Sequence, residues 1–295
     1  MNVSGYRPVL RLLLVGVLTI AACATPDASK HTSVRGQRLS QGCGRPAPKS
    51  PATHLMVAGR QRSFMLIVPK DYHSWQPQQL VFAFHGRTNN NAKVRGYYDL
   101  ERYAAQPTLF VYPSGLQGKS GHFTWSAPRD PAHALRDYAF FDALLADIGK
   151  RYCVALNHVY IVGHSLGAWF SNSLACARAS RIRAVATLGG GISARACQDA
   201  VAAMIVHNPK DRLVPVADGR RARDMFLKHN GLLEMRDVPL ATHDLNCRRY
   251  GHQAERNPVL WCPHTHDYTW RGKYYPHNWP RGTGRAMMAF FASLP

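Results

Sequence analysis

One serine in the chain has the neighbours that a catalytic nucleophile requires. Ser165 is the central residue of the segment Gly163-His164-Ser165-Leu166-Gly167, which has the pattern Gly-x-Ser-x-Gly. An apolar run that predicts a strand, Val159–Val162, precedes this segment, and a run that predicts a helix, Ala168–Ala179, follows it. At such a strand–turn–helix junction the backbone turns too sharply for larger side chains two residues either side of the serine. The pattern therefore predicts nucleophilic attack by Ser165; the alternative is a tight structural turn.

A serine nucleophile needs a carboxylate that orients its base. This acid is expected on the loop after a later strand, and Ala202–Val206 predicts such a strand. Asp211 follows it, in Asp211-Arg212-Leu213-Val214-Pro215. Asp218 and Asp224 are alternatives, but both lie in or beside the next predicted helix. We therefore predict Asp211 as the acid.

The base is expected in a loop before the last predicted helix, Gly284–Ala292. Among the 15 histidines, His264, His266 and His277 lie in this part of the chain. His277, in Tyr275-Pro276-His277-Asn278-Trp279-Pro280, is nearest to the helix, and we predict it as the base. A metal site is the alternative use of the other two histidines, together with Cys262 and Asp267. The chain has no Cys-x-x-Cys pair that would favour zinc, so we expect neither a metal nor a cofactor.

Two backbone N–H groups are expected to stabilise the oxyanion that forms during acyl transfer. One belongs to Leu166, directly after the nucleophile, and the other to Arg87, in the loop after the predicted strand Leu80–Phe84. Nearby aromatic side chains are expected to line the substrate pocket: His85, His164, Trp125 and Trp279. For Trp125 the alternative is a tryptophan buried in the core.

The elements that hold these residues alternate between strands and helices. Further strands are predicted at 64–68, 108–111 and 184–188, and further helices at 140–150 and 219–228. Apolar strands separated by helices indicate an α/β protein with a mostly parallel sheet that helices cover on both faces. Such sheets carry their chemistry at the carboxyl ends of the strands, where the segments with Arg87, Ser165 and Asp211 begin.

Several segments together resemble a known family, the secreted esterases that group feruloyl esterases with polyhydroxybutyrate depolymerases. The matching segments are Phe84-His85-Gly86, Gly163–Gly167, Ser173-Leu174-Ala175-Cys176, Asp211–Pro215, His277-Asn278-Trp279-Pro280 and the opening Gly42-Cys43-Gly44. This resemblance implies the α/β-hydrolase fold and serine carboxylic-ester hydrolysis. It implies as substrates either feruloyl and other phenolic esters of polysaccharide or hydroxybutyrate-type short-chain esters.

The N-terminus has the pattern of an export signal. Arg7 and Arg11 precede the apolar stretch Leu12–Ala22, which is too short to span a bilayer. The stretch ends in Ile20-Ala21-Ala22-Cys23, which resembles the lipobox of bacterial lipoproteins; an ordinary signal peptide is the alternative. We expect a signal peptide at 1–22, lipidation of Cys23, a flexible tether at 23–52 and a catalytic domain at 53–295. The protein would then be exported and anchored at the cell envelope, in the outer membrane if the cell is Gram-negative, or secreted.

Six of the seven cysteines remain if Cys23 carries the lipid, and six cysteines in an exported chain suggest disulfides with 15 possible pairings. A strand rising to Ser165 and a helix returning from it could bring Cys153 near Cys176. Cys247 and Cys262 flank one loop. The expected set is therefore Cys153–Cys176, Cys247–Cys262 and, from the remaining two, Cys43–Cys197.

The charge is strongly positive, with 37 Lys and Arg against 17 Asp and Glu, a net charge of +20. Such a surface attracts polyanions, but the basic residues are scattered, so we expect no nucleic-acid partner. The expected partners are an ester substrate and, through the anchor, a membrane, with the protein a monomer. The alternative function is a non-catalytic envelope lipoprotein that binds anionic polymers; a nucleophile, an acid and a base, in that order along the chain, argue against it.

Overall fold

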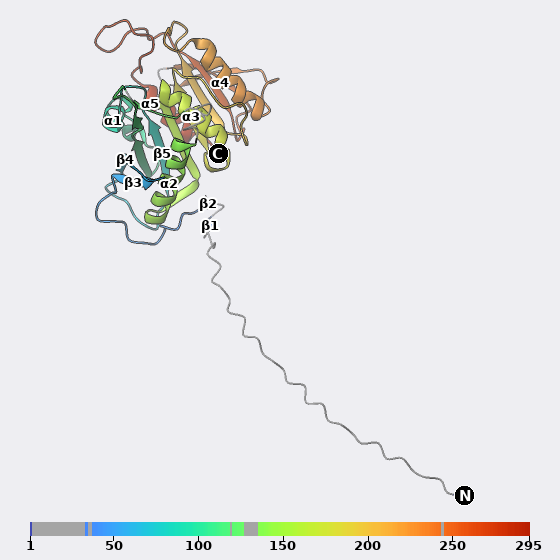
Figure 1. Ribbon diagram of the computed structural model, residues 1–295. Helices are drawn as coiled ribbons and strands as arrows, with labels where there is room; N and C mark the ends of the chain where they lie inside the picture. The colour runs from blue at the N-terminus through green and yellow to red at the C-terminus, as the bar shows by residue number, and fades with distance from the viewer. Residues whose placement is uncertain (2–32, 35–36, 119, 127–134, 243–244) are drawn as a thin grey trace. The chain divides into compact units, whose positions relative to one another are not determined.

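A ten-stranded sheet lies at the centre of the computed structural model (Figure 1). Its strands are β3 (His54–Val57), β4 (Arg60–Ile67), β5 (Gln78–Phe84), β6 (Thr108–Pro113), β9 (Val154–His164), β10 (Ala184–Leu188), β11 (Ala202–His207), β12 (Val238–Thr242), β13 (Leu245–Tyr250) and β14 (Val259–Pro263). They follow one another in the order β12-β13-β14-β11-β10-β9-β5-β6-β4-β3. Neighbours from β14 to β6 are parallel, and those at both edges are antiparallel. The predicted, mostly parallel α/β-hydrolase sheet is confirmed.

In the part of the chain that the structure describes, five α-helices cover the two faces of this sheet. They are α1 (Asn91–Tyr98), α2 (Arg136–Arg151), α3 (Leu166–Ala177), α4 (Val216–His229) and α5 (Thr283–Ala292). Side chains of α2, α3 and α4 share one buried apolar cluster, and those of α1 and α5 share the other (Figure 1). Strand β5 contributes side chains to the two clusters in alternation. Leu80 and Phe82 belong to the first cluster and Val81 to the second, as the two-residue period of a strand requires.

The structure describes residues 1, 33–34, 37–118, 120–126, 135–242 and 245–295. From Ser33 onward these residues belong to one compact unit. Its shorter elements are β1 (Ser33–Val34), β2 (Gln37–Arg38), β7 (Leu116–Gln117), β8 (Phe123–Thr124) and the 3₁₀ turns η1 (Glu101–Tyr103) and η2 (Ala179–Arg181). The predicted signal peptide and Cys23 lie outside the described residues. None of the helices in the described ranges is long and apolar enough to cross a membrane.

The segment before residue 53 was expected to be a tether, but part of it packs on the body. Leu39 and Ser40 are buried. The Ser40 N–H donates to the Val154 carbonyl at 2.9 Å, and the Gly42 N–H donates to the Gly149 carbonyl at 2.8 Å. These bonds hold the segment against the end of α2 and the start of β9. The predicted domain boundary at residue 53 is therefore too late.

Three disulfides occur among the described residues, and two of the predicted pairings are wrong. The bonds are Cys43–Cys153, Cys176–Cys197 and Cys247–Cys262. Only Cys247–Cys262 was predicted, and it joins neighbouring strands, β13 and β14, rather than the ends of one loop. Three disulfides fit the oxidising environment of an exported protein.

The length of β9 explains the error at Cys153. This strand has 11 residues and begins at Val154, not near Val159 as expected. At about 3.3 Å per residue it rises roughly 36 Å to Ser165. The return along α3 to Cys176 covers only about 16 Å at 1.5 Å per residue. Cys176 therefore stops far short of Cys153, which instead lies beside the packed N-terminal segment.

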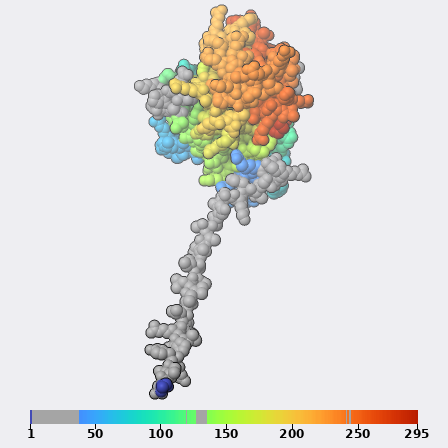
Figure 2. All heavy atoms as spheres, turned by 90° about the vertical axis from the view of Figure 1, so that its right-hand side faces the viewer, coloured from blue at the N-terminus to red at the C-terminus, as the bar shows by residue number. Residues whose placement is uncertain are grey.

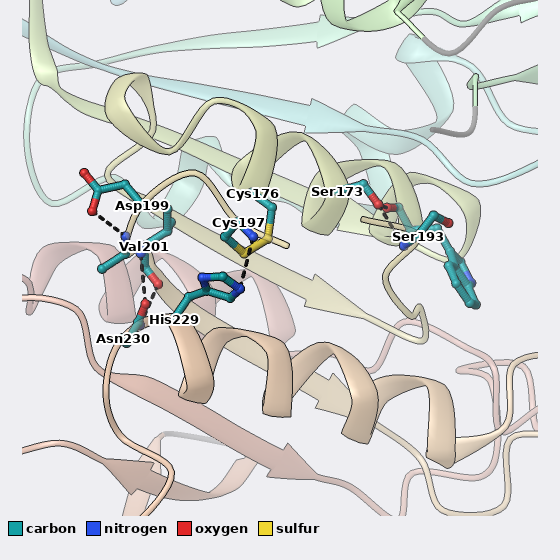
Figure 3. Close-up of a disulfide and its surroundings, with 10 residues drawn as sticks. Ser173, Cys176, Ser193, Cys197, Asp199, Val201, His229 and Asn230 are labelled. Atoms are coloured by element: carbon teal, nitrogen blue, oxygen red, sulfur yellow. Dashed lines mark hydrogen bonds between the residues drawn. A yellow bond between two sulfur atoms is a disulfide. The ribbon is translucent and has the colours of Figure 1, made fainter. Parts of the chain in front are cut away.

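Cys197 reaches Cys176 because the chain after β10 runs back along α3 (Figure 3). The Ser193 N–H donates to Ser173 Oγ at 3.0 Å, and the Gln198 N–H donates to the Cys176 carbonyl at 2.9 Å. From the other side, the Cys197 N–H donates to His229 Nε2 of α4 at 3.2 Å. The disulfide thus fixes the loop that begins at the Gly189-Gly190-Gly191 turn to the helix that follows Ser165.

Candidate active site

Ser165 occupies a strained turn between β9 and α3. Its φ is 56° and its ψ is −123°, a conformation that non-glycine residues rarely adopt. A Cβ at Gly163 would overlap the Gly167 carbonyl, and a Cβ at Gly167 would overlap the Phe84 carbonyl. Both glycines are therefore required by close approach of backbone, as the sequence pattern predicts. Leu166 is the first residue of α3, so its N–H has no acceptor within the helix.

His277 and Asp211 form a buried pair. His277 Nδ1 lies 2.5 Å from Asp211 Oδ2, and both side chains are buried. The other carboxylate oxygen, Asp211 Oδ1, accepts the N–H groups of Leu213 and Val214 at 2.9 and 3.0 Å. Burial raises the pKa of Asp211, but the hydrogen bonds from His277 and from Val214 outweigh it, and the net pKa lies below its ordinary value. Asp211 is therefore an ionised acceptor for the His277 Nδ1–H.

Ser165 and His277 are held at the same end of β10. The Ser165 N–H donates to the Leu188 carbonyl at 3.0 Å. The two glycines after Leu188 lie close to His277 and Ser165. A Cβ at Gly189 would lie 3.1 Å from His277 Cε1, and a Cβ at Gly190 would lie 3.0 Å from the Ser165 carbonyl oxygen. A glycine turn after β10 thus leaves room for the imidazole beside the serine.

His164 joins the serine turn to the loop that carries His277. Its Nε2 donates to the His277 carbonyl at 3.1 Å, which leaves Nδ1 to accept the Tyr97 hydroxyl at 3.3 Å. Burial and the nearby His277 lower the pKa of His164 to about 3, so the ring is neutral as this pattern requires. His164 therefore fixes the loop position of the predicted base.

Hydrogen bonds from neighbouring segments hold the predicted oxyanion loop, His85-Gly86-Arg87, in place. The Gly115 N–H donates to His85 Nε2 at 2.9 Å, so Nδ1 carries the proton and donates to the Gly86 carbonyl at 2.8 Å. Trp125 Nε1 donates to the His85 carbonyl at 2.8 Å. Gly86 lies against the nucleophile, since a Cβ there would be 3.2 Å from Ser165 Cβ.

A cavity of about 520 Å³ opens beside His164. Its aromatic lining residues are Tyr97, His164, His266, Tyr268, Trp270, Tyr275 and Trp279. Two of the predicted pocket residues, His164 and Trp279, line this cavity, and their contact with substrate stays a prediction. The prediction is wrong for His85 and Trp125, which are buried beneath the oxyanion loop and support it; Trp125 packs on Phe84 and Phe170.

The alternative acids and bases do not form such a pair. Asp218 makes an ion pair with Arg221 on α4, and Asp224 pairs with Arg223 at the surface. His264 Nδ1 accepts the backbone N–H of His266 at 3.3 Å. Within the described ranges, no three His, Cys, Asp or Glu side chains lie together so that they could hold a metal ion.

The segments that carry the acid and the base gather at one end of the molecule. On the face drawn in Figure 2, the chain from β11 onward forms the upper surface, above the surface of the first half of the chain. Asp211 and His277 both come from this later part, whereas Ser165 comes from the middle of the chain. The site therefore depends on tertiary packing between distant segments.

Because several histidines are buried, we predict that the folded protein loses stability as the pH falls below the ordinary histidine pKa. Burial lowers the pKa of His85 and His264 from 6.5 to about 4, and that of His164 to about 3. The unfolded chain therefore binds more protons than the folded one between pH 6.5 and 4, so stability is complete above pH 6.5 and falls as the pH drops towards 4. A shift of this size corresponds to about 3 kcal/mol for one histidine.

Urea unfolding at pH 7.5, 5.5 and 4.5 measures this effect. We expect the free energy of unfolding to decrease by several kcal/mol across this range, before Asp211 begins to be protonated. The same free energy at pH 7.5 and 4.5 would show that these rings are not held neutral in the folded state.

Two of the solved structures that share this fold are those of esterases. The chain resembles the acetyl xylan esterase of Aspergillus awamori with a TM-score of 0.58 and 14% identity, covering 79% of this chain and 94% of that one. It resembles the Bacillus cereus carboxylesterase with a TM-score of 0.54 and 12% identity, covering 78% and 93%. The fold is thus that of the α/β-hydrolase esterases.

Relatives in sequence identify the family. The chain is 30% identical over 212 residues to a probable feruloyl esterase C of Aspergillus niger, covering 69% of this chain and 73% of the relative. It is 29% identical over 236 residues to feruloyl esterase D of Neurospora crassa, covering 75% and 73%. No family model matches the chain. The chain belongs to the feruloyl esterase family and is a carboxylic ester hydrolase, so the alternative of a non-catalytic lipoprotein is not retained.

Proposed function

We propose that the protein hydrolyses feruloyl or related phenolic esters, with Ser165 as nucleophile, His277 as base and Asp211 as acid. The observation that carries the proposal is the buried His277–Asp211 pair, at 2.5 Å, next to the glycine turn that borders the strained serine. Strain that the surrounding packing maintains is typical of functional residues.

In the first half of the reaction, His277 Nε2 removes the proton from Ser165 Oγ while that oxygen attacks the ester carbonyl carbon. The carbonyl π electrons move to its oxygen, and the N–H groups of Leu166 and Arg87 stabilise the resulting oxyanion, each contributing about 3–4 kcal/mol. When the intermediate collapses, His277 gives its proton to the leaving alkoxide. An acyl-enzyme and a free alcohol result.

In the second half, water replaces the alcohol. His277 takes a proton from the water as its oxygen attacks the acyl carbon, and then returns the proton to Ser165 Oγ. The products are the carboxylic acid and free enzyme. Asp211 remains ionised throughout: it keeps the proton of neutral His277 on Nδ1 and stabilises the imidazolium that forms in each half.

The substrate class rests on the relatives and on the cavity. The similar proteins are named feruloyl esterases. Aromatic rings line the cavity beside His164, among them those of Tyr97 and Trp279, and such rings favour a substrate with flat apolar faces. Hydroxybutyrate-type esters, the other class that the family resemblance implies, are flexible and offer no such face.

A substrate panel tests the proposed class. We expect kcat/KM for methyl ferulate to exceed kcat/KM for 3-hydroxybutyrate oligomers by about tenfold or more. We expect the same margin over p-nitrophenyl butyrate once kcat/KM is corrected for the better leaving group of that ester. Each assay is repeated with Ser165→Ala to subtract background hydrolysis. Preferential cleavage of the hydroxybutyrate oligomers would overturn the proposed substrate class.

A further inference from the structure

A strongly basic surface lies at the amino end of the parallel sheet, opposite the candidate active site. Two neighbouring cavities, each of about 440 Å³, lie on this surface, and both are lined by Arg38, Leu156 and Arg181. The first cavity extends along α2 to Lys150, and the second extends to residues that precede β10, β11 and β14. Ser165 follows the other end of β9, so roughly 30 Å of strand separates it from Leu156.

Positive charge dominates the lining of these two cavities. The carboxylates among the described lining residues are those of Asp142 and Asp199. Asp142 already forms an ion pair with Arg178 at 2.8 Å and a second one with Arg181 at 3.0 Å. The cations outnumber the carboxylates, and they are Arg38, Lys150, Arg181, Arg183 and Arg256. All of them except Arg183 are exposed. These five cations form the basic face of the protein.

Three cations of the basic face have no partner in the part of the chain that the structure describes. The side chains of Arg38, Lys150 and Arg256 form neither an ion pair nor a hydrogen bond with a described residue. These residues come from segments that are far apart in the sequence, so the fold gathers on one face charges that are scattered along the chain. Because no described carboxylate pairs with them, their charges attract anions from solution.

The chain enters the folded body at the basic face. Arg38 belongs to β2, which Figure 1 shows at the lower end of the body, and the next residue, Leu39, forms an antiparallel bridge with Ala155 of β9. Cys23, which the lipobox-like pattern predicts to be lipidated, precedes Arg38 by 15 residues, so at most about 50 Å of chain joins them. A lipid on Cys23 would therefore keep the basic face close to a membrane, where even a weak affinity is sufficient for binding.

We propose that the basic face binds a membrane surface rich in anionic phospholipid. Lipid phosphates accept charge-assisted hydrogen bonds from guanidinium and ammonium groups, and the two cavities give headgroups room between these side chains. A membrane fits better than a soluble polyanion, because the segment that leads to Cys23 enters the body at this face. The bound protein holds Ser165, at the other end of β9, away from the lipid and open to substrate. The inference does not depend on which ester the protein hydrolyses.

Vesicle binding tests this inference. The parent is the full chain with Cys23→Ser, which lacks the predicted acyl acceptor, and its partition onto vesicles of phosphatidylcholine mixed with phosphatidylglycerol is measured by co-sedimentation. Each basic residue near such a surface strengthens binding about fivefold. We therefore expect a basic-face variant of this parent to partition about a hundredfold less, its substitutions being Arg38→Gln, Lys150→Gln and Arg256→Gln. The apolar stretch at 12–22 is common to both proteins, so the difference between them reports on the basic face.

The matched control removes the same charge beside the other end of the sheet, from exposed side chains of β4, α1 and α4, through Arg60→Gln, Lys93→Gln and Arg220→Gln. We expect this control to bind like its parent, and circular dichroism checks that all three proteins are folded.

Equal partition of the parent and the basic-face variant would overturn the inference, and so would equal losses in this variant and in the control. Tighter binding of the parent to soluble polygalacturonate than to the anionic vesicles would also overturn it, in favour of an acidic polysaccharide. The proposed function fails separately, through absence of methyl ferulate hydrolysis by the unmodified chain, because the vesicle experiment requires no catalysis.

Discussion

Replacing Ser165 with alanine is expected to lower kcat/KM for methyl ferulate by about four orders of magnitude or more. The hydroxyl is the atom that forms the acyl-enzyme, and neither His277 nor the oxyanion donors can substitute for it. The fold should persist, because the turn is imposed by Gly163 and Gly167 and by the Ser165 backbone bond to Leu188 rather than by the hydroxyl. Steady-state kinetics and circular dichroism of the same preparation measure both expectations.

Ser173→Ala is the matched control for this variant. Ser173 lies on the same helix, is buried, and accepts the Ser193 N–H at 3.0 Å. Its loss removes a structural hydrogen bond at a cost of about 1–3 kcal/mol but no reacting atom. Activity of Ser165→Ala within tenfold of the unmodified protein would remove Ser165 from the mechanism.

Asp211→Asn is expected to lower kcat by about four orders of magnitude through the tautomer of His277. Asp211 Oδ1 accepts two backbone N–H groups, so the carbonyl oxygen of an amide must occupy that position. The amide NH₂ then faces His277 Nδ1 and donates to it. The imidazole proton moves to Nε2, which can no longer accept the proton of Ser165.

Asp218→Asn is the control, since Asp218 is one of the alternative acids in this part of the chain and pairs with Arg221 rather than with a histidine. We expect its kcat to change less than tenfold, as surface ion pairs contribute little. Comparable losses of kcat in Asp211→Asn and Asp218→Asn would mean that Asp211 does not orient His277.

The site could be predicted where one short segment carries the information. The positions of Gly163 and Gly167 encode the strained turn directly, and Asp211 follows its strand closely. The rest depends on contacts between distant segments. The direction in which a ring near the oxyanion loop points is set by its partners, which is why His85 and Trp125 were assigned to the pocket although they lie beneath the loop.

The sequence analysis misses strands on the β12 side of the sheet and helix α1. Strand β13, between β12 and β14, alternates buried residues, such as Leu245 and Cys247, with exposed ones, and short alternating runs give a weak signal. Helix α1 begins after Asn90, whose side chain accepts the Lys93 N–H, a cap that resembles a polar loop in sequence. For the aromatic side chains at 268–275 that line the cavity, the sequence offers one signal, the density of Tyr and Trp in this segment.

Covalent labelling with a fluorophosphonate is the most direct test of Ser165 as the nucleophile. The reagent reacts only with an activated serine, because the base must remove the proton as the phosphorus is attacked. Peptide mapping is expected to find one equivalent of label per chain, on the peptide that contains Ser165, with a much slower reaction in Asp211→Asn. Label on another residue, or continued methyl ferulate hydrolysis after Ser165 is fully labelled, would contradict the assignment.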